Sequence, residues 1–145
     1  MTGAGAAAAL GYPDYGLITM SEMADNAGHI ADTVDVPVIA DADTGYGNEL
    51  NATRTVREYE RRGVAGLHIE DQAFPKRCGH LDNKVVISLD EYLAKIKAAV
   101  AARRFYGAFA LCDGVLAIAA AVKGGPRRRA GGSRLLDCSG SPWAF

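Results

Sequence analysis

Two short apolar runs, each followed at once by carboxylates, constrain the fold of this chain more than any other feature. The run 37–40 leads into Asp41, and the run 66–69 leads into Glu70. Apolar, partly β-branched runs of this length are typical of strands buried on both faces, and the residues between them suffice for a crossover helix. The pattern predicts a parallel βαβ unit with carboxylates at the C-terminal ends of its strands, where parallel α/β folds place their chemistry.

Helical periodicity precedes this unit. A glycine turn at 2–5 leads into a short helix, and a loop with proline and glycine follows. Over 20–34, apolar side chains recur at the helical period and charged ones lie off that face. Thr19 or Ser21 is the expected N-terminal cap of this second helix.

The crossover helix is expected over 51–62, with Gly63 as its C-terminal cap. A capping box that starts at Ser88 predicts a further helix ending near Arg103. A strand–helix repeat of about 30 residues is the rhythm of a (β/α)₈ barrel, which takes about 250 residues to close. The expected fold class is therefore α/β, a partial TIM-type barrel with about half of the barrel present.

Composition indicates a soluble globular protein. Hydrophobic residues make up 49% of the 145 residues and the formal net charge is −1, which differs from disordered and membrane classes. The N-terminus has no charged segment before its alanine run, so we expect a cytoplasmic protein without a secretory signal. The three cysteines have no metal-like spacing and fit reduced thiols.

The average charge hides a division of the chain. Residues 1–102 hold nine Lys and Arg against fifteen Asp and Glu, whereas 103–145 hold seven against two. We therefore expect a partial barrel domain over 1–104 and an unrelated basic tail over 105–145. A nucleic-acid-binding arm is one interpretation of the basic run at 123–132. A disordered or frameshifted tail is the interpretation that the Arg, Gly, Ala and Pro bias favours.

Carboxylates gather at the predicted strand ends. Asp41 and Asp43 follow the first strand, Glu70 follows the second, and Asp14 lies in the earlier loop. Carboxylate oxygens and waters are the ligands that Mg²⁺ prefers, and like charges held together need a cation. The alternative is helix capping by Asp43 or Thr44 with a solvated Glu70, and Asp14 as a plain turn residue.

One thiol lies in a basic loop. Cys78 follows Lys76 and Arg77 and precedes Gly79 and His80. Neighbouring cations favour the thiolate and suit proton transfer or nucleophilic attack, and a glycine permits close approach by a ligand. The alternative is a cysteine that merely fills space on a charged loop.

Five motifs in this order resemble one enzyme family. They are Thr2-Gly3-Ala4, Pro13-Asp14, Asp41-Ala42-Asp43-Thr44-Gly45-Tyr46-Gly47, His68-Ile69-Glu70-Asp71-Gln72 and Lys76-Arg77-Cys78-Gly79-His80. Over 2–104 the chain resembles the isocitrate lyase and phosphoenolpyruvate mutase superfamily, in particular its methylisocitrate-lyase-like branch. The resemblance implies a (β/α)₈ barrel that assembles as homodimers or homotetramers, a small carboxylate substrate, and neither nucleic acid nor membrane as a partner.

The resemblance also implies roles for individual residues. Asp41 resembles the direct ligand of Mg²⁺, or alternatively Mn²⁺, with Asp43, Asp14 and Glu70 holding its waters. The implied substrate-binding residues are Thr2, Gly3, Ala4 and Gly79. The implied proton-transfer group is Cys78, with Arg77 and His80 tuning the thiol. The family usually has Ser where Thr2 stands.

The implied reaction is cleavage of a 2-hydroxy tricarboxylate such as methylisocitrate to an α-oxo acid and a dicarboxylate. The alternatives are a carboxyvinyl-carboxyphosphonate phosphorylmutase and an inactive fragment. The family's first strand and helix, before Thr2, and its strands after residue 104 have no counterpart in the sequence. We therefore expect a fragment whose site is incomplete and whose tail is read out of frame.

Overall fold

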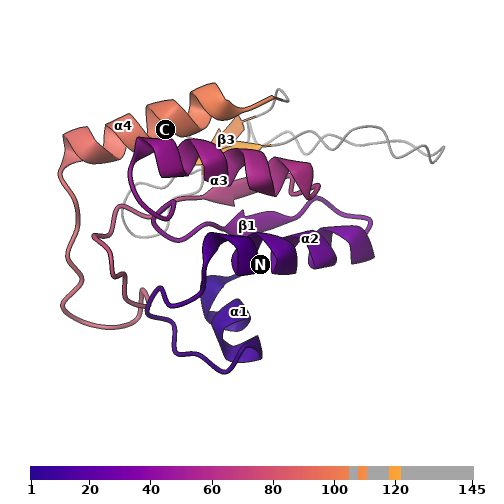
Figure 1. Ribbon diagram of the computed structural model, residues 1–145, viewed down its shortest axis with the longest axis horizontal. Helices are drawn as coiled ribbons and strands as arrows, with labels where there is room; N and C mark the ends of the chain where they lie inside the picture. Colours follow the sequence, from indigo (N-terminus) through magenta and orange to yellow (C-terminus); the bar gives the residue numbers. More distant parts are fainter. Residues whose placement is uncertain (105–107, 111–117, 122–145) are drawn as a thin grey trace, which may run out of the picture.

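The computed structural model describes residues 1–104, 108–110 and 118–121 (Figure 1). The elements follow in the order α1 (Gly3–Ala9), α2 (Met20–Thr33), β1 (Ile39–Asp41), α3 (Glu49–Arg61), β2 (Gly66–His68), α4 (Leu89–Ala102), β3 (Ala108–Ala110) and β4 (Ile118–Ala121). The predicted strand–helix–strand unit is present as β1, α3 and β2, and the four predicted helices are confirmed.

Strands β1 and β2 run parallel, with Ile39 opposite Gly66 and Asp41 opposite His68. Met1 extends this pairing on the other side of β1. Its ammonium donates to the carbonyl of Ile39 at 2.8 Å, and its carbonyl accepts from the amide of Asp41 at 3.2 Å. This alternation is the bond pattern of a parallel neighbour, so β1 is hydrogen-bonded along both of its edges.

The sheet changes direction beyond β2. Its order is β1-β2-β4-β3, and both the β2–β4 and the β3–β4 pairs are antiparallel. Strands β3 and β4 lie beyond residue 104, and their order differs from the parallel succession of a barrel. A short connection joins them, and short connections permit only antiparallel neighbours. The parallel β1–β2 pair agrees with the partial barrel, which otherwise stays a prediction; the basic run at 123–132 lies outside the described residues.

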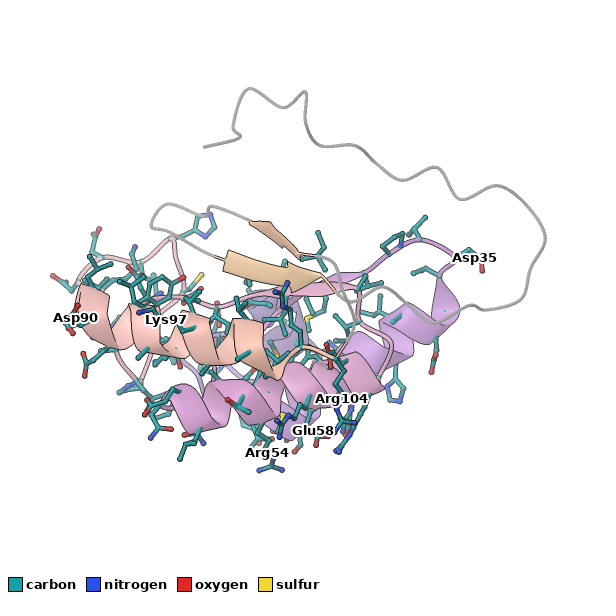
Figure 2. The ribbon with its side chains drawn as sticks, turned by 90° about the horizontal axis from the view of Figure 1, so that it is seen from above. Asp35, Arg54, Glu58, Asp90, Lys97 and Arg104 are labelled. Carbon is teal, nitrogen blue, oxygen red and sulfur yellow. The ribbon has the colours of Figure 1, made fainter. Side chains whose placement is uncertain are left out.

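Helices α3 and α4 lie side by side over one face of the sheet (Figures 1 and 2). Arg54 of α3 points away from the strands in Figure 2, and the opposite side of each helix is apolar. The buried residues of the two helices include Ala52, Val56, Tyr59, Tyr92, Ile96 and Ala99. They pack with Leu67 and Ile69 in one core. No helix in the described residues has the length and apolar character needed to span a bilayer.

Capping chemistry fixes where two of the helices begin. Thr19 accepts from the amide of Glu22, whose side chain returns a bond to the amide of Thr19, so the predicted cap of α2 is confirmed. Ser88 and Glu91 form the same reciprocal pair at α4, as predicted. Each pair satisfies donors that the first turn of a helix leaves free.

The start of α3 differs from the prediction. Asn48 caps this helix and accepts from the amide of Leu50, so the helix begins at Glu49. The alternative in which Asp43 or Thr44 caps it is wrong, because a turn with Gly45 at φ +78° separates them from the first helical residue. The C-cap is Arg62, and Gly63, the predicted cap, follows it at φ +76°.

Candidate active site

Four polar side chains lie at the C-terminal ends of the parallel pair. Asp41 and His68 end β1 and β2, and Asp43 (φ +44°) and Glu70 each follow two residues beyond the strand. Asp41 and His68 are register partners, and the amide of Glu70 donates to the carbonyl of Asp43 at 2.7 Å. The register therefore brings the predicted carboxylates together at the C-terminal ends of β1 and β2.

Asp41 lies at the centre of this group, with 7% of its surface exposed. Its Oδ2 accepts from the amide of Gly3 at 2.8 Å, and its Oδ1 accepts from the amide of Asp43 at 2.9 Å. Nε2 of His68 lies 3.0 Å from Oδ1. These contacts with the start of α1 and with the neighbouring strand hold Asp41 in one orientation.

Asp14, Asp41, Asp43 and Glu70 form the acidic group, and Lys76 enters it from the loop 71–87 that carries Cys78, the cysteine loop. Its side chain is 2% exposed, and its Nζ donates to Oδ1 of Asp14 and lies 2.8 Å from Oδ1 of Asp43. Burial disfavours its charge, but the facing Asp43 and Asp14 carboxylates outweigh burial and hold the pKa of Lys76 above its usual value. Lys76 is thus a buried cation between two of the predicted metal-binding carboxylates.

One lysine does not offset all of this negative charge. Burial raises the pKa of Asp43, with Lys76 opposing the rise. Burial likewise raises the pKa of Glu70 to about 7. The charge of Lys76 opposes this rise, and the Asp41 and Asp43 carboxylates add to it. Carboxylates that are destabilised in this way are where a further cation would be bound most favourably.

The raised pKa of Glu70 predicts how metal-free stability depends on pH. An unfolded carboxyl titrates near 4.5 and the folded one near 7, so between these values the folded state binds more protons. Stability therefore falls as pH rises through this window. We expect the thermal unfolding midpoint in EDTA to decrease as the pH is raised from 5 to 8. Glu70→Gln should make this decrease smaller. The same slope in both proteins would contradict this assignment.

Within residues 1–104, no three His, Cys, Asp or Glu side chains already converge to hold a metal ion. Three observations nevertheless fit a bound metal ion at this position. Lys76 stands as a cation between two carboxylates, and apart from this ion pair the buried Oδ1 of Asp43 has no hydrogen-bond donor among the described residues. A Cβ on Gly3 would come within 2.9 Å of Asp41 Oδ2 and 3.1 Å of Asp43 Oδ1. The donors are hard oxygens, which suit Mg²⁺ or Mn²⁺.

The cysteine loop is tied directly to this acidic group. Nε2 of Gln72 donates to Glu70 Oε2 at 2.8 Å and to the carbonyl of Arg77 at 2.9 Å, while Oε1 accepts the amide of Arg77 at 3.0 Å. The amide of Cys78 donates to the carbonyl of Asp14 at 3.1 Å. These bonds attach the backbone of residues 77 and 78 to Gln72 and Asp14, and through Gln72 to Glu70.

The thiol itself is partly exposed. Cys78 Sγ lies 3.7 Å from Nδ1 of His80, so the predicted pair is brought together. Gly79 is exposed, and a Cβ added to it would meet nothing within 4 Å, which leaves room for a ligand. Arg77 is held through its backbone, and its side chain is exposed.

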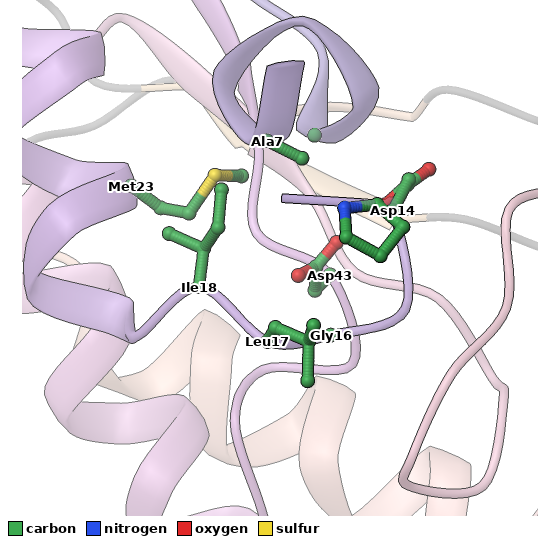
Figure 3. A pocket seen from close by; sticks show the side chains of 9 residues that line it. Ala7, Asp14, Gly16, Leu17, Ile18, Met23 and Asp43 are labelled. Atoms are coloured by element: carbon green, nitrogen blue, oxygen red, sulfur yellow. The ribbon is translucent and has the colours of Figure 1, made fainter. Parts of the chain in front are cut away.

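The predicted substrate turn forms the start of α1. Thr2 is its N-cap and accepts the amide of Gly5 at 3.2 Å, whereas Gly3 points its amide at Asp41 and Ala4 is exposed. Beside this turn lies a shallow depression lined by residues of α1, the loop that follows it and α2, together with Asp43. Figure 3 shows Asp14 and Asp43 on one side of the depression and Met23 and Ile18 on the other.

Sequence reasoning gave no role to His68 and Gln72, and it placed Lys76 beside the Cys78 thiol, whereas the structure turns the Lys76 ammonium into the carboxylates. His68 is the register partner of Asp41, two residues before Glu70, and this spacing on one strand was available as a signal. Gln72 links Glu70 to the cysteine loop. Lys76 reaches Asp14 from 62 residues away, a contact that no local pattern contains.

Residues 1–113 match the family model described as phosphoenolpyruvate phosphomutase. The chain belongs to this family. It is 55% identical over 104 residues to 2,3-dimethylmalate lyase of Eubacterium barkeri, covering 71% of this chain and 36% of that one. It is 53% identical over 104 residues to 2-methylisocitrate lyase of Aeropyrum pernix, covering 72% and 34%.

Solved structures agree with this phosphoenolpyruvate phosphomutase family assignment. A crystal structure of 2,3-dimethylmalate lyase, described as a member of the PEP mutase/isocitrate lyase superfamily, has a TM-score of 0.70 at 50% identity and covers 72% of this chain and 35% of that one. A phosphonopyruvate hydrolase complexed with oxalate and Mg²⁺ has a TM-score of 0.63 at 37% identity, with 70% and 34% covered. The chain spans about a third of the length of the curated relatives it matches.

Proposed function

We propose that this chain carries the metal-binding and proton-transfer residues of a Mg²⁺-dependent carbon–carbon lyase. The substrate class is a 2-hydroxy carboxylate such as 2-methylisocitrate, and the products are an α-oxo acid and a dicarboxylate. The observation that carries this proposal is that the carboxylates and the cysteine loop are hydrogen-bonded to each other. Carboxylates at the ends of β1 and β2 are bonded through Gln72 and Asp14 to the loop that holds Cys78.

The acidic group supplies the metal ligands. Asp41, fixed by the amides of Gly3 and Asp43, would bind Mg²⁺ directly. Asp43, Asp14 and Glu70 would hold its waters, in keeping with the preference of Mg²⁺ for few direct protein ligands. When bound, the cation polarises the hydroxyl and carboxylate oxygens of the substrate as a Lewis acid. Mn²⁺ is the expected substitute, because its ligand preferences are similar.

Cys78 supplies the proton. The substrate hydroxyl gives its proton to a carboxylate of the acidic group, and its O–H electron pair forms the carbonyl of the oxo acid. The electron pair of the breaking carbon–carbon bond moves to the departing dicarboxylate carbon. The Cys78 thiol protonates the departing carbon. Nδ1 of His80, 3.7 Å from Sγ, then faces the thiolate that remains. Gly79 gives the substrate access, since its surroundings are open.

The first residues of α1 orient the substrate. The turn Thr2–Gly3–Ala4 lies against Asp41. These residues would bind a carboxylate of the substrate next to the acidic group. The adjoining depression is polar at Asp14 and Asp43 and apolar at Ile18 and Met23.

A phosphorylmutase is the second candidate. The family model that the chain matches is described as phosphoenolpyruvate phosphomutase. A relative from Arabidopsis thaliana with 51% identity is named carboxyvinyl-carboxyphosphonate phosphorylmutase. Cys78 favours the lyase, because moving a phosphoryl group needs positioning and charge stabilisation but no thiol acid.

An assay of products separates the two candidates. Purified protein with Mg²⁺ is offered 2-methylisocitrate, 2,3-dimethylmalate and phosphoenolpyruvate. We expect pyruvate from the hydroxy acids, followed by coupled oxidation of NADH, and no new carbon–phosphorus signal in ³¹P NMR. EDTA should abolish release. A carbon–phosphorus product without pyruvate from either hydroxy acid would overturn the lyase in favour of the mutase.

Three further expectations belong to this proposal. The protein acts in the cytoplasm, it assembles as a homodimer or homotetramer, and its substrate is a small carboxylate. Residues 1–104 form the catalytic part and 105–145 an unrelated tail. Gel filtration with light scattering tests the assembly, and sequencing of the coding DNA tests the tail for a change of frame after codon 104.

A further inference from the structure

We infer that Lys76 is an internal substitute for the divalent cation: it occupies the acidic group while metal is absent and must withdraw when metal binds. This inference rests on the proposed metal site and goes beyond it, because it assigns a competing role to a lysine on the cysteine loop. The juxtaposition that carries it is the buried ammonium of Lys76 between Asp14 and Asp43.

The Lys76 side chain is buried against two carboxylates. Lys76 is 3% exposed, although lysine is almost never buried unless it is paired. Its partners are two carboxylates that come from different parts of the chain, the loop after α1 and the end of β1. The ammonium therefore already bridges two of the carboxylates that the proposed metal site uses.

Lys76 Nζ also takes up space beside both Asp41 and Asp43. The Cβ that Gly3 lacks would come within 3.4 Å of Lys76 Nζ as well as close to both Asp41 and Asp43. The ammonium, the two carboxylates and the start of α1 thus share one crowded volume. A divalent cation coordinated by Asp41, with its waters on Asp43 and Asp14, needs the volume and the oxygens that Lys76 uses.

The negative charge of the acidic group exceeds the positive charge of Lys76. Four carboxylates, those of Asp14, Asp41, Asp43 and Glu70, lie together with one lysine and His68. A divalent cation offsets more of this charge than the ammonium does, so it has the electrostatic advantage in the exchange. Breaking two buried ion pairs is the cost of that exchange.

The exchange also concerns the loop. Lys76 lies two residues before Cys78, so its withdrawal releases one of the bonds that tie the loop to Asp14. Gln72 and the Cys78 amide keep their own bonds to the acidic group. Metal binding therefore loosens the loop at Lys76 while its other attachments hold.

The test compares Mn²⁺ binding by Lys76→Met with that by wild type and by Lys97→Met, a matched substitution of an exposed lysine on α4. Free Mn²⁺ is measured by electron paramagnetic resonance. We expect Lys76→Met to bind Mn²⁺ about tenfold more tightly, because no buried ion pair has to be broken. Lys97→Met should match wild type. The Mg²⁺-induced rise in thermal midpoint should also be larger for Lys76→Met.

The outcomes are distinguishable. Equal or weaker binding by Lys76→Met, with wild type binding Mn²⁺, overturns the competition and leaves the metal site standing. No binding by any of the three overturns the metal site and the competition with it. A second measurement uses wild type alone, in case the variant fails to fold. Acetylation of Lys76, located by mass spectrometry, should accelerate severalfold with Mg²⁺ while that of Lys97 does not; unchanged protection of Lys76 contradicts the inference.

Discussion

Cys78→Ser is expected to abolish almost all lyase turnover while leaving the metal site intact. A positioned general acid contributes about 10²- to 10⁴-fold to rate, and a serine hydroxyl is a far weaker acid than a thiol. We therefore expect kcat for pyruvate release from 2-methylisocitrate to fall by about this factor. The loop should keep its position, because the amide of residue 78 still donates to Asp14. Coupled pyruvate detection measures the loss.

Mn²⁺ affinity serves as the control for this variant. The carboxylates of the acidic group do not contact Sγ, whose bond partner is Nδ1 of His80. Binding should therefore equal that of wild type, which separates lost chemistry from lost folding. Turnover within a few-fold of wild type would show that Cys78 only fills space on the loop and would remove the assigned proton donor.

The second large effect is expected for Asp41→Asn. The substitution preserves size but removes the charge at the centre of the acidic group and replaces one acceptor oxygen with a donor. The amide of Gly3 or of Asp43 then loses its acceptor. We expect Mn²⁺ affinity to fall by about 100-fold or more, since loss of even an outer partner of a metal ligand costs 10- to 100-fold. Mn²⁺ titration followed by electron paramagnetic resonance measures it.

Asp25→Asn is the matched control. Asp25 is an exposed residue of α2 whose Oδ1 pairs with Nε of Arg62 at 2.7 Å, away from the acidic group. The same chemical change there should leave Mn²⁺ affinity unaltered. If Asp41→Asn bound Mn²⁺ as tightly as Asp25→Asn, the direct ligand would have to lie elsewhere.

The parallel unit and its carboxylates were predictable because they depend on local patterns. An apolar run ending in Asp41, another ending in Glu70 and a helical stretch between them suffice to place both side chains at one edge of a sheet. The cap at Thr19 and the capping box at Ser88 are likewise local, and both are confirmed.

The internal arrangement of the site was not predictable to the same degree. Lys76 and Asp14 are 62 residues apart, and their contact depends on how two loops fold over the strand ends. The cap of α3 was missed because Asp43 and Thr44 are also common capping residues, and only the turn at Gly45 excludes them. Strand direction beyond β2 depends on pairing, which composition does not encode.

Calorimetric titration of Mg²⁺ into the purified chain tests the central claim most directly. The claim is that the carboxylates at the ends of β1 and β2 hold one divalent cation. The account predicts one saturable site per chain, lost in Asp41→Asn and kept in Asp25→Asn. Absence of binding, or binding that survives Asp41→Asn unchanged, would contradict it.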